Sequence, residues 1–540
     1  MSLSDVVDFV IVGSGFGGAV AALRLTEKGH QVVIIEEGKR WRPEDFPKTN
    51  WNLRKYLWLP HWHCFGIQRI DYLGDVVVLR GAGVGGGSLV YANTLIVPPD
   101  AAFASGWPEG FRERLHPHYR TVQRMLGATP PPRLWPAEEH LRDFARSLGR
   151  EQAFAQPPVG IVFGEKAGER VPDPYFAGRG PERATCQSCG GCMVGCRHNA
   201  KNTLDRNYLH LAEQLGARIV AETRVTQLEE EGGGYRIHVR SSTAWSAKPQ
   251  IMRARQVVLA AGALGTVELL LASQAAGSLK RLSPRLGQFV RSNSEVICAA
   301  RELGHKVDHS QGIAIASHFQ ASPDTSLEIV RYPAGSDAMG LLGTLAAPGS
   351  QRFMRILRWL GQCVRHPWRW LVNTIPFGFA KRSVIVLAMQ TVDNALRLVR
   401  KKGWLGGYHL RSRRDGGTPA IPSYLPLANQ AAHHVAERMG GFPLNSINEV
   451  LLGVPITAHI LGGARMADSP DQGVVDPSCR VFGHPGLFIV DGSAIPANLG
   501  ANPSLTIAAV AEYAMSLVRP KLAPTEVLDD PAPDKGGALT

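Results

Sequence analysis

Residues 8–36 read DFVIVGSGFGGAVAALRLTEKGHQVVIIE, and this stretch decides how the rest of the chain is interpreted. Its apolar start, residues 9–12, is typical of a buried parallel strand. Gly13, Gly15 and Gly18 follow with the spacing G-x-G-x-x-G. At this spacing the first glycine permits a tight turn, the second lets the backbone approach a diphosphate, and the third lets the helix lie close to the strand.

The residues after these glycines complete a strand–helix–strand unit. Residues 19–28 have helical period and stop at Gly29, which suits the end of a helix. A second apolar run at 32–35 then leads to Glu36, at the place where a carboxylate accepts hydrogen bonds from a ribose. This order predicts a dinucleotide-binding site rather than an ordinary turn between a strand and a helix.

Length and composition indicate a globular protein with two or more domains. The chain has 540 residues, of which 44% are apolar. No apolar run reaches the roughly 18 residues that cross a bilayer. Asp5 and Asp8 stand where a secretory signal carries basic residues, so we expect a cytoplasmic protein.

The charge balance is basic, with 59 lysines and arginines against 46 acidic residues and a net charge of +13. Such a surplus suits an acidic electron-acceptor protein or anionic lipid headgroups, although it also serves solubility alone. We expect no nucleic-acid partner, because no basic stretch carries the interleaved aromatic residues of a binding module.

A second glycine-rich segment, residues 80–93, reads RGAGVGGGSLVYAN. Five of the seven residues 81–87 are glycine, and each glycine loses conformational entropy on folding. They therefore suit a backbone that passes a flat ligand or a diphosphate. Asn93 is the polar residue of the ordered stretch that follows, and we expect it to face that ligand.

These two segments resemble the glucose-methanol-choline (GMC) family of flavoprotein oxidoreductases, and within it the cholesterol-oxidase-like branch. The resemblance extends to residues 257–273 and 286–295, and it implies FAD rather than NAD. It implies an α/β fold in which a Rossmann-like FAD-binding domain is joined to a discontinuous α+β substrate-binding domain. The cofactor-binding residues that it implies are Gly13, Gly15, Gly18, Glu36, Gly83, Gly86, Gly87, Ser88, Asn93, Val225, Asp491 and Gly492.

We expect the chain to pass repeatedly between the two domains. The FAD-binding domain is predicted to comprise residues 1–125, 186–300 and 441–520, and the substrate-binding domain residues 126–185 and 301–440. Most of the first substrate-domain segment, rich in proline and glycine, reads as irregular. The last residues, 521–540, are predicted to form a disordered tail.

Two residues are candidates for catalysis. Oxidising an alcohol by hydride transfer requires a group that takes the hydroxyl proton, and histidine has a pKa suited to that task. His459 lies in TAHILGGARM (457–466), which resembles the family's segment whose histidine faces the reactive edge of the flavin. Asn502 lies in NLGANPSLTI (498–507), at the position of the family's second active-site residue, where an amide hydrogen-bonds the substrate oxygen.

A glutamate over the substrate is a further feature of the cholesterol-oxidase-like branch. Residues 326–335 loosely resemble the region that carries it, which makes Glu328 and Asp337 candidates. The favoured interpretation of both is an exposed surface carboxylate.

Four of the eight cysteines lie within eleven residues, at C-x2-C-x2-C-x3-C, the spacing of bacterial ferredoxins without the proline that usually follows. An iron–sulfur cluster, a zinc or other metal site, and free thiols or local disulfides all remain open. With a cluster, electrons leave one at a time to a protein acceptor; without one, oxygen is the easier acceptor. The candidate ligands are Cys186, Cys189, Cys192 and Cys196.

Residues 353–364 predict an amphipathic helix with arginines between its apolar positions, and tryptophans follow Pro367, which ends it. This pattern is typical of a protein that rests on a membrane surface. The alternative is a helix docked on the protein's own core with its arginines in solvent.

The sequence as a whole predicts an FAD-dependent oxidoreductase that oxidises an apolar alcohol, sterol-like or long-chain, to its carbonyl by hydride transfer to flavin N5. The alternatives are an oxygen-using cholesterol oxidase with isomerase activity, a membrane-associated flavin and iron–sulfur electron-transfer protein, and an NAD-dependent dehydrogenase.

Overall fold

The computed structural model describes residues 6–244, 246, 248–304, 306–403, 407–414 and 417–521. The predicted disordered tail, apart from its first residue, lies outside the described residues. Two seven-stranded sheets form the frame of the molecule, and each contains segments that are far apart in the sequence.

The first sheet has the strand order β12–β2–β1–β15–β14–β13, and β25 pairs with β15. Strands β12, β2, β1, β15 and β25 run parallel, whereas β13, β14 and the start of β15 form antiparallel pairs. The parallel strands are almost wholly apolar because both faces are buried. Their bounds are Val6–Val12 (β1), Val32–Ile35 (β2), Arg218–Val220 (β12), Thr223–Glu231 (β13), Gly234–Ser241 (β14), Gln250–Leu259 (β15) and Leu487–Ile489 (β25).

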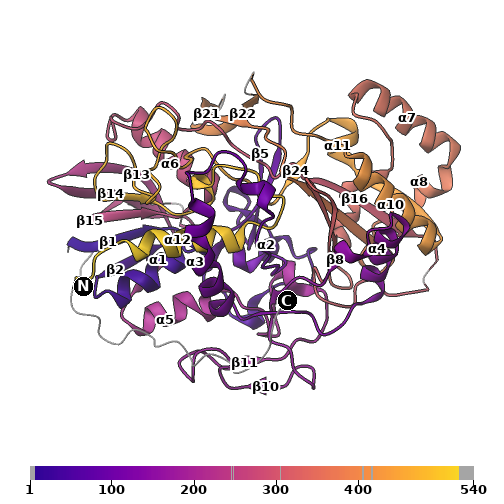
Figure 1. Cartoon of the computed structure of the whole chain (residues 1–540), viewed down its shortest axis with the longest axis horizontal. Helices are drawn as coiled ribbons and strands as arrows, with labels where there is room; N and C mark the ends of the chain where they lie inside the picture. Colours follow the sequence, from indigo (N-terminus) through magenta and orange to yellow (C-terminus); the bar gives the residue numbers. More distant parts are fainter. Residues whose placement is uncertain are drawn as a thin grey trace.

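Helices from both ends of the chain cover this sheet. The indigo helix α1 lies beside the yellow helix α12, and α3 and α5 pack against this pair (Figure 1). Helix α6 lies against β13. Their bounds are Phe16–Glu27 (α1), Phe111–Met125 (α3), Tyr208–Gln214 (α5), Gly262–Ala275 (α6) and Ser504–Ser516 (α12).

The second sheet is antiparallel and has the order β19–β23–β16–β20–β18–β17–β8. Helices α10 (Pro426–Met439) and α4 (Pro136–Ser147) cover one of its faces (Figure 1). The other face of this sheet is therefore free to face the first sheet and the space between the two sheets. The strand bounds are Phe154–Ala155 (β8), Val296–Glu302 (β16), His318–Ser322 (β17), Thr325–Val330 (β18), Gly343–Leu345 (β19), Ser383–Gln390 (β20) and Gly441–Ser446 (β23).

Shorter elements surround these two layers. The strands are Trp58–Leu59 (β3), Cys64–Phe65 (β4), Gln68–Tyr72 (β5), Val77–Gly81 (β6), Ala128–Thr129 (β7), Val159–Gly160 (β9), Arg170–Val171 (β10), Arg183–Ala184 (β11), Leu396–Lys402 (β21), Tyr408–Arg414 (β22) and Ile456–Thr457 (β24). The remaining helices are Leu53–Tyr56 (α2), Arg352–Arg365 (α7), Pro367–Thr374 (α8), Phe379–Arg382 (α9) and Ile447–Leu451 (α11).

The predicted fold class, a Rossmann-like domain joined to an α+β domain, is confirmed, but one local expectation is wrong in part. Within the segment expected to be irregular, Pro136–Ser147 form α4, with Pro136 at its first turn and Glu138 accepting a hydrogen bond from the Trp135 N–H (3.1 Å).

Candidate active site

A cavity of about 910 Å³ lies between the two sheets. Its lining includes most of the predicted cofactor-binding residues and both candidate catalytic residues. Gly18, Gly83, Ser88 and Asn93 do not line it. The predicted residues that do are Gly13, Gly15, Glu36, Gly86, Gly87, Val225, Asp491, Gly492, His459 and Asn502.

The turn between β1 and α1 has no room for side chains. Gly13 has a φ of +96°, and a Cβ there would lie 2.3 Å from the Ala260 carbonyl oxygen. A Cβ on Gly18 would lie 2.0 Å from the Gly13 carbonyl oxygen. Helix α1 follows directly, so its N-terminal N–H groups and the positive end of its dipole are at the cavity wall.

The second glycine-rich segment packs against this turn. Gly86 has a φ of +54°, and a Cβ there would lie 2.6 Å from the Gly15 Cα. Ser88 is buried and structural, since its hydroxyl donates to the Gly85 carbonyl (2.7 Å) and accepts from the Leu204 N–H (3.0 Å). Asn93 is fully buried, and its side-chain amide has no hydrogen-bond partner among the described residues.

Glu36 joins the two glycine-rich segments. Its carboxylate accepts hydrogen bonds from the Ser14 hydroxyl (2.7 Å) and from the backbone N–H groups of Ser14 (3.1 Å), Gly38 (2.8 Å) and Gly83 (3.3 Å). Burial raises the pKa of this carboxyl, and the hydrogen bonds offset only part of the effect. Glu36 therefore holds the cofactor-side turn together, and its contact with a ribose stays a prediction.

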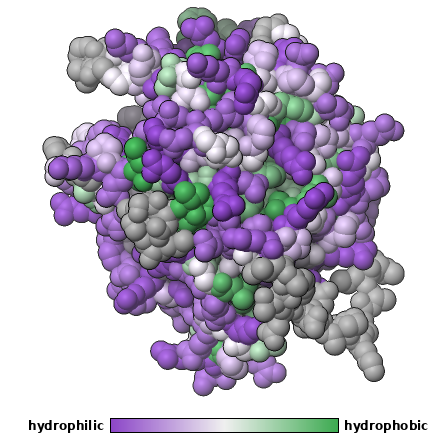
Figure 2. Space-filling model, turned by 90° about the vertical axis from the view of Figure 1, so that its left-hand side faces the viewer, coloured by the Kyte–Doolittle hydropathy of each residue, from purple (hydrophilic) through white to green (hydrophobic). Residues whose placement is uncertain are grey.

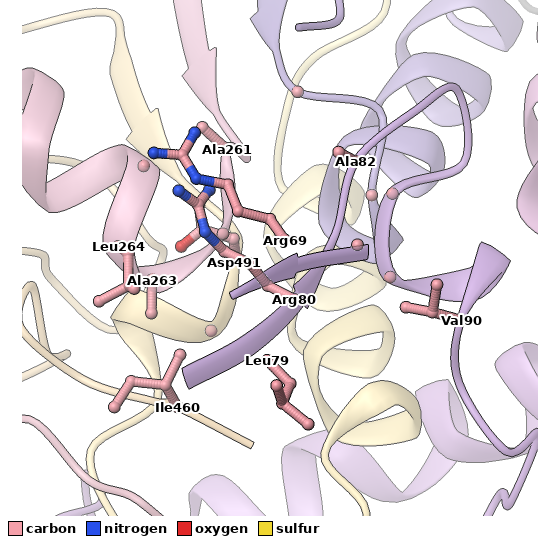
Figure 3. Close-up of a pocket in the computed structure, with 18 of the residues that line it drawn as sticks. Arg69, Leu79, Arg80, Ala82, Val90, Ala261, Ala263, Leu264, Ile460 and Asp491 are labelled. Atoms are coloured by element: carbon pink, nitrogen blue, oxygen red, sulfur yellow. The ribbon is translucent and has the colours of Figure 1, made fainter. Parts of the chain in front are cut away.

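Two arginines that sequence analysis did not single out point into the same cavity. Figure 3 shows the guanidinium groups of Arg69 and Arg80 extending toward the turn that carries Ala261. Both donate to Asp71, Arg69 over 3.1 Å and Arg80 over 2.7 Å. Burial raises the pKa of Asp71, but the two guanidinium charges outweigh it and hold the pKa at about 2. Positive charge is thus fixed where an anionic cofactor has to be neutralised.

His459 is paired with a carboxylate that the sequence did not reveal. Nδ1 of His459 is in ion-pair contact with Oε1 of Glu295, which is almost completely buried. The other oxygen of Glu295 accepts a hydrogen bond from the Ala458 N–H (2.9 Å). Because Nδ1 is engaged, Nε2 is the ring nitrogen left for a ligand. Burial lowers the pKa of His459, but the Glu295 charge outweighs it and the net shift is upward.

Asn502 is also held by a buried carboxylate. Its side-chain N–H donates to Oε2 of Glu328 (3.2 Å), while Oε1 of Glu328 contacts Nδ1 of His318 (3.3 Å). The side-chain oxygen of Asn502 has no hydrogen-bond partner among the described residues. The expectation of an exposed Glu328 is therefore wrong, because β18 places this residue in the interior of the second sheet.

Asp337, the other candidate carboxylate, is also buried rather than exposed. It accepts hydrogen bonds from the backbone N–H groups of Gly378 (2.9 Å) and Ala380 (2.9 Å), at the start of α9. Asp337 therefore holds a helix end and does not line the cavity.

The second sheet gives the cavity an apolar wall. Ile297 on β16 lies opposite Leu387 on β20, and Leu387 lies opposite Glu328 on β18, so the three residues form one row across the sheet. Apolar side chains surround this row. Those that line the cavity are Met193, Ile297, Ile315, Val330, Met339, Ile385 and Leu387.

All eight cysteines lie in the described part of the chain, and all are free thiols there, so the local-disulfide interpretation is wrong. Among the described residues, no three histidine, cysteine or acidic side chains are grouped closely enough to hold a metal ion. Burial raises the pKa of the Cys186 and Cys189 thiols, and it raises that of Cys192 to about 11.

Three family models match the chain. Residues 8–43 match an FAD binding domain, and residues 178–291 and 431–511 match two models described as GMC oxidoreductase. FAD is therefore supported as the cofactor of the glycine-lined part of the cavity.

Characterised proteins are similar over nearly the whole chain. A cholesterol oxidase of Acinetobacter baumannii is 42% identical over 527 residues, which cover 95% of this chain and 94% of that protein. A cholesterol oxidase of Mycobacterium tuberculosis is 44% identical over 528 residues, 94% of this chain and 90% of that protein. A long-chain-alcohol oxidase of Arabidopsis thaliana is 25% identical over 544 residues, 93% of this chain and 66% of that protein.

Solved structures share the fold at low sequence identity. Pyridoxine 4-oxidase from Mesorbium loti aligns with a TM-score of 0.58 and 17% identity, covering 94% of this chain and 98% of that one. An FAD-dependent oxidoreductase from Chaetomium thermophilum aligns with a TM-score of 0.58 and 15% identity, with the same coverage of both chains.

Proposed function

This chain belongs to the GMC oxidoreductase family, and from that premise we propose that it oxidises the hydroxyl group of an apolar alcohol, sterol-like or long-chain, to a carbonyl. Family membership and the cholesterol oxidase relatives make it an FAD-dependent oxidoreductase that acts on CH–OH groups. The observation that carries the proposal is that His459 and Asn502 line the same cavity as the glycine-rich turns and a set of apolar side chains.

The glycine-lined part of the cavity fits FAD. No side chain fits between Gly15 and Gly86, and the α1 N-terminus lies at the same cavity wall. Arg69 and Arg80 add positive charge to it. FAD bound there supplies the hydride acceptor.

His459 manages the proton in this proposal. Nε2 accepts the proton of the substrate hydroxyl as the adjacent carbon gives up its hydride. Glu295 holds the ring through Nδ1 and stabilises the positive charge that the ring gains. Because Glu295 stabilises the protonated ring, it makes His459 a better acceptor for the proton of the substrate hydroxyl.

Asn502 positions the oxygen that is oxidised. It uses one N–H on Glu328, which leaves its second N–H to donate to the substrate oxygen. Such a hydrogen bond fixes the hydroxyl group relative to His459 and supports the growing carbonyl. Glu328 in turn fixes the orientation of the amide.

The apolar lining defines the substrate class. Aliphatic side chains from β16, β18 and β20 surround the space next to the catalytic pair, and they suit a large apolar body with a single hydroxyl group. The names of the relatives agree, since they include two cholesterol oxidases and a long-chain-alcohol oxidase.

Anaerobic flavin reduction tests the proposal. Cholesterol and a long-chain primary alcohol are expected to bleach the flavin of the purified protein, whereas glycerol is not. In His459→Ala the rate falls by about 10²–10⁴-fold while FAD is retained. His116→Ala, an exposed histidine on α3, is the matched control and keeps the rate of the natural chain. An unchanged rate in His459→Ala, or reduction by glycerol alone, contradicts the proposal.

We also propose that α7 and α8 rest on an anionic membrane surface from which such a substrate is drawn. The buried residue of α7 is Arg355, whereas apolar side chains of both helices face outward, with Val364 82%, Phe353 71% and Trp368 67% exposed. Arg352, Arg358 and Arg365 are exposed as well, so the two helices present apolar and basic side chains to solvent side by side. In the described part of the chain, no helix has the length and apolarity to cross a bilayer.

The charges of this segment favour anionic lipid as the occupant. Residues 351–382 contain six arginines and one lysine and no acidic residue. The two helices project at the edge of the second sheet (Figure 1), while the face at the β13–β14 end is mostly hydrophilic, with small separate apolar patches (Figure 2). An apolar stripe with a basic surround is typical of an interfacial helix.

Vesicle sedimentation tests the membrane surface. The chain is expected to sediment with phosphatidylglycerol-containing vesicles and less with pure phosphatidylcholine. The double variant Val364→Glu/Trp368→Glu stays in the supernatant, and Leu215→Glu, an exposed leucine beyond α5, behaves like the natural chain. Equal sedimentation of the double variant and the natural chain contradicts the assignment.

A further inference from the structure

The four clustered cysteines surround a second cavity, of about 240 Å³. Cys186, Cys189, Cys192 and Cys196 all line it, and the 3-10 turn Gly191–Val194 lies in the middle of their loop. The cavity that holds the catalytic pair does not include any of them. The structure therefore brings all four thiols to one space that the proposed alcohol oxidation does not use.

Glycines let this loop fold around the cavity. Gly190 has a φ of +69° and Gly195 a φ of +88°, and a Cβ on either would lie within 2.5 Å of its surroundings, the Ser310 carbonyl oxygen and the Phe46 ring respectively. The loop is also anchored to the segment between β16 and β17, since the Gly190 N–H donates to the Gly312 carbonyl (2.7 Å).

Backbone N–H groups point at the sulfur atoms. The Ser188 N–H donates to Sγ of Cys186 (3.4 Å), and N–H groups of Gly191 and Ala314 donate to Cys189 and Cys192. Hydrogen bonds from backbone to sulfur stabilise thiolate ligands and set the potential of a thiolate-bound centre.

The cavity is positively charged. Lys48, Arg197 and Lys201 line it, and among the described residues no aspartate or glutamate does. Lys201 is almost completely buried, and its ammonium group donates to the carbonyls of Cys192 (2.7 Å), Tyr91 (2.9 Å) and Leu89 (3.1 Å). Such cations complement the negative charge of a centre that carries four thiolates.

The spacing of the thiols distinguishes one ion from a cluster. In the described part of the chain, no three candidate ligands are close enough to share a single metal ion, which argues against zinc. All four nevertheless face one cavity. We propose that this cavity binds one [4Fe–4S] cluster through the four cysteine thiolates, so that the ferredoxin-like spacing serves a single centre.

The position of the cavity gives the centre a role, which rests on the proposed function. Through Lys201 it adjoins Leu89 and Tyr91, in the segment that lines the cofactor cavity. Oxidation of one alcohol releases two electrons and two protons. A cluster held by the four cysteines would supply a one-electron relay, through which the two electrons would leave one after the other to two molecules of a one-electron acceptor protein while the protons go to solvent.

Metal analysis of the anaerobically purified full chain tests the proposal. About four iron and four acid-labile sulfide per chain are expected, before or after reconstitution with Fe²⁺ and sulfide, together with an electron paramagnetic resonance signal after dithionite reduction. In Cys189→Ser and Cys186→Ser, iron and sulfide fall by about ten-fold or more while FAD is retained. Cys64→Ser and Cys363→Ser, cysteines outside the cavity, are the matched controls and keep both.

Four outcomes overturn the proposal: zinc without sulfide, no iron after reconstitution, unchanged iron in both cavity variants, or equal loss in the controls. Loss of FAD would reveal that the cavity variants do not fold. In that case the iron and sulfide content of the natural chain decides whether a cluster is bound. These readouts need no alcohol. Failure of the cluster is therefore distinguishable from failure of alcohol oxidation, which is read by flavin bleaching.

Discussion

Two buried carboxylates orient the two residues that are proposed to contact substrate. Glu295 and Glu328 lie at the start of β16 and within β18, where neither is exposed, and each contacts one member of the catalytic pair. A buried carboxylate without a partner is costly, so each pair is held in one arrangement. The pH dependence of activity follows from the first of these contacts.

Glu295→Gln is expected to shift the acidic limb of the pH profile. The Glu295 charge raises the pKa of His459, so in the natural chain the neutral, proton-accepting form is lost as pH falls through a value above the ordinary 6.5. Without that charge the pKa falls, and activity persists to a pH lower by about 1–3 units. Stopped-flow flavin reduction across pH measures the limb, with Glu213→Gln as a surface control. An unmoved limb shows that His459 does not set it.

Glu449 is expected to make stability depend on pH. Burial raises its pKa from an ordinary value of 4.5 to about 8, although the charge of Arg355 opposes this. Between these values the folded chain binds more protons than the unfolded chain, so stability falls as pH rises, by at most about 1.4 kcal/mol per pH unit. Thermal unfolding of Glu449→Gln between pH 5 and 8 should show a flatter decline, and the same slope in both proteins contradicts the assignment.

At the scale of elements, the contact of the two glycine-rich segments shapes the cofactor part of the cavity. Gly86 lies against Gly15, and no side chain fits between them. Sequence spacing indicated that both segments serve the same ligand. Their mutual contact appears only when β1 and the short helix after β6 are folded together.

Gly86→Ala is expected to lower FAD affinity by about ten-fold or more. The added methyl group forces the segments apart, which costs about 1–3 kcal/mol of folding free energy. Gly110→Ala is a matched control, because Gly110 has a similar φ of +64° but open space around its Cβ position. FAD content and fluorescence titration measure the effect, and equal losses in both variants attribute it to backbone strain alone.

Elements with strong local patterns were predicted well, and the others were not. The strands β1 and β2 and the helix α1 follow from uninterrupted apolar runs and helical period. Helix α4 was missed because proline and glycine dominate the residues around it, and its start depends on a capping contact of Glu138. The sequence predicted a helix at α7. It did not reveal that Arg355 is buried, where its guanidinium group donates to backbone carbonyl groups of other segments.

At the scale of the whole molecule, the cavity is lined by segments that are far apart in the sequence. Its lining runs from Val12 to Ile507 and includes both sheets. A ligand that binds this cavity therefore stabilises the folded arrangement of both domains at once.

Removal of FAD is expected to lower the thermal unfolding temperature of the entire chain. At 100 times its dissociation constant, a ligand adds about 2.7 kcal/mol to the folded state, so a shift of several degrees should disappear with the flavin and return when FAD is added. Calorimetry of the apo and reconstituted proteins measures it. An unchanged unfolding temperature contradicts a cofactor bound between the two sheets.

By itself, the sequence determined the Rossmann-like unit, the use of FAD, the family, and the two residues proposed for catalysis. These features are written in contiguous motifs, because turns, strands and cofactor loops depend on residues close together in the chain. Only the tertiary structure decided that Glu295 holds His459, that Glu328 is buried behind Asn502, and that four cysteines share one cavity with Lys201. Those relations depend on which distant segments pack together, and packing is set by the whole fold rather than by any local pattern.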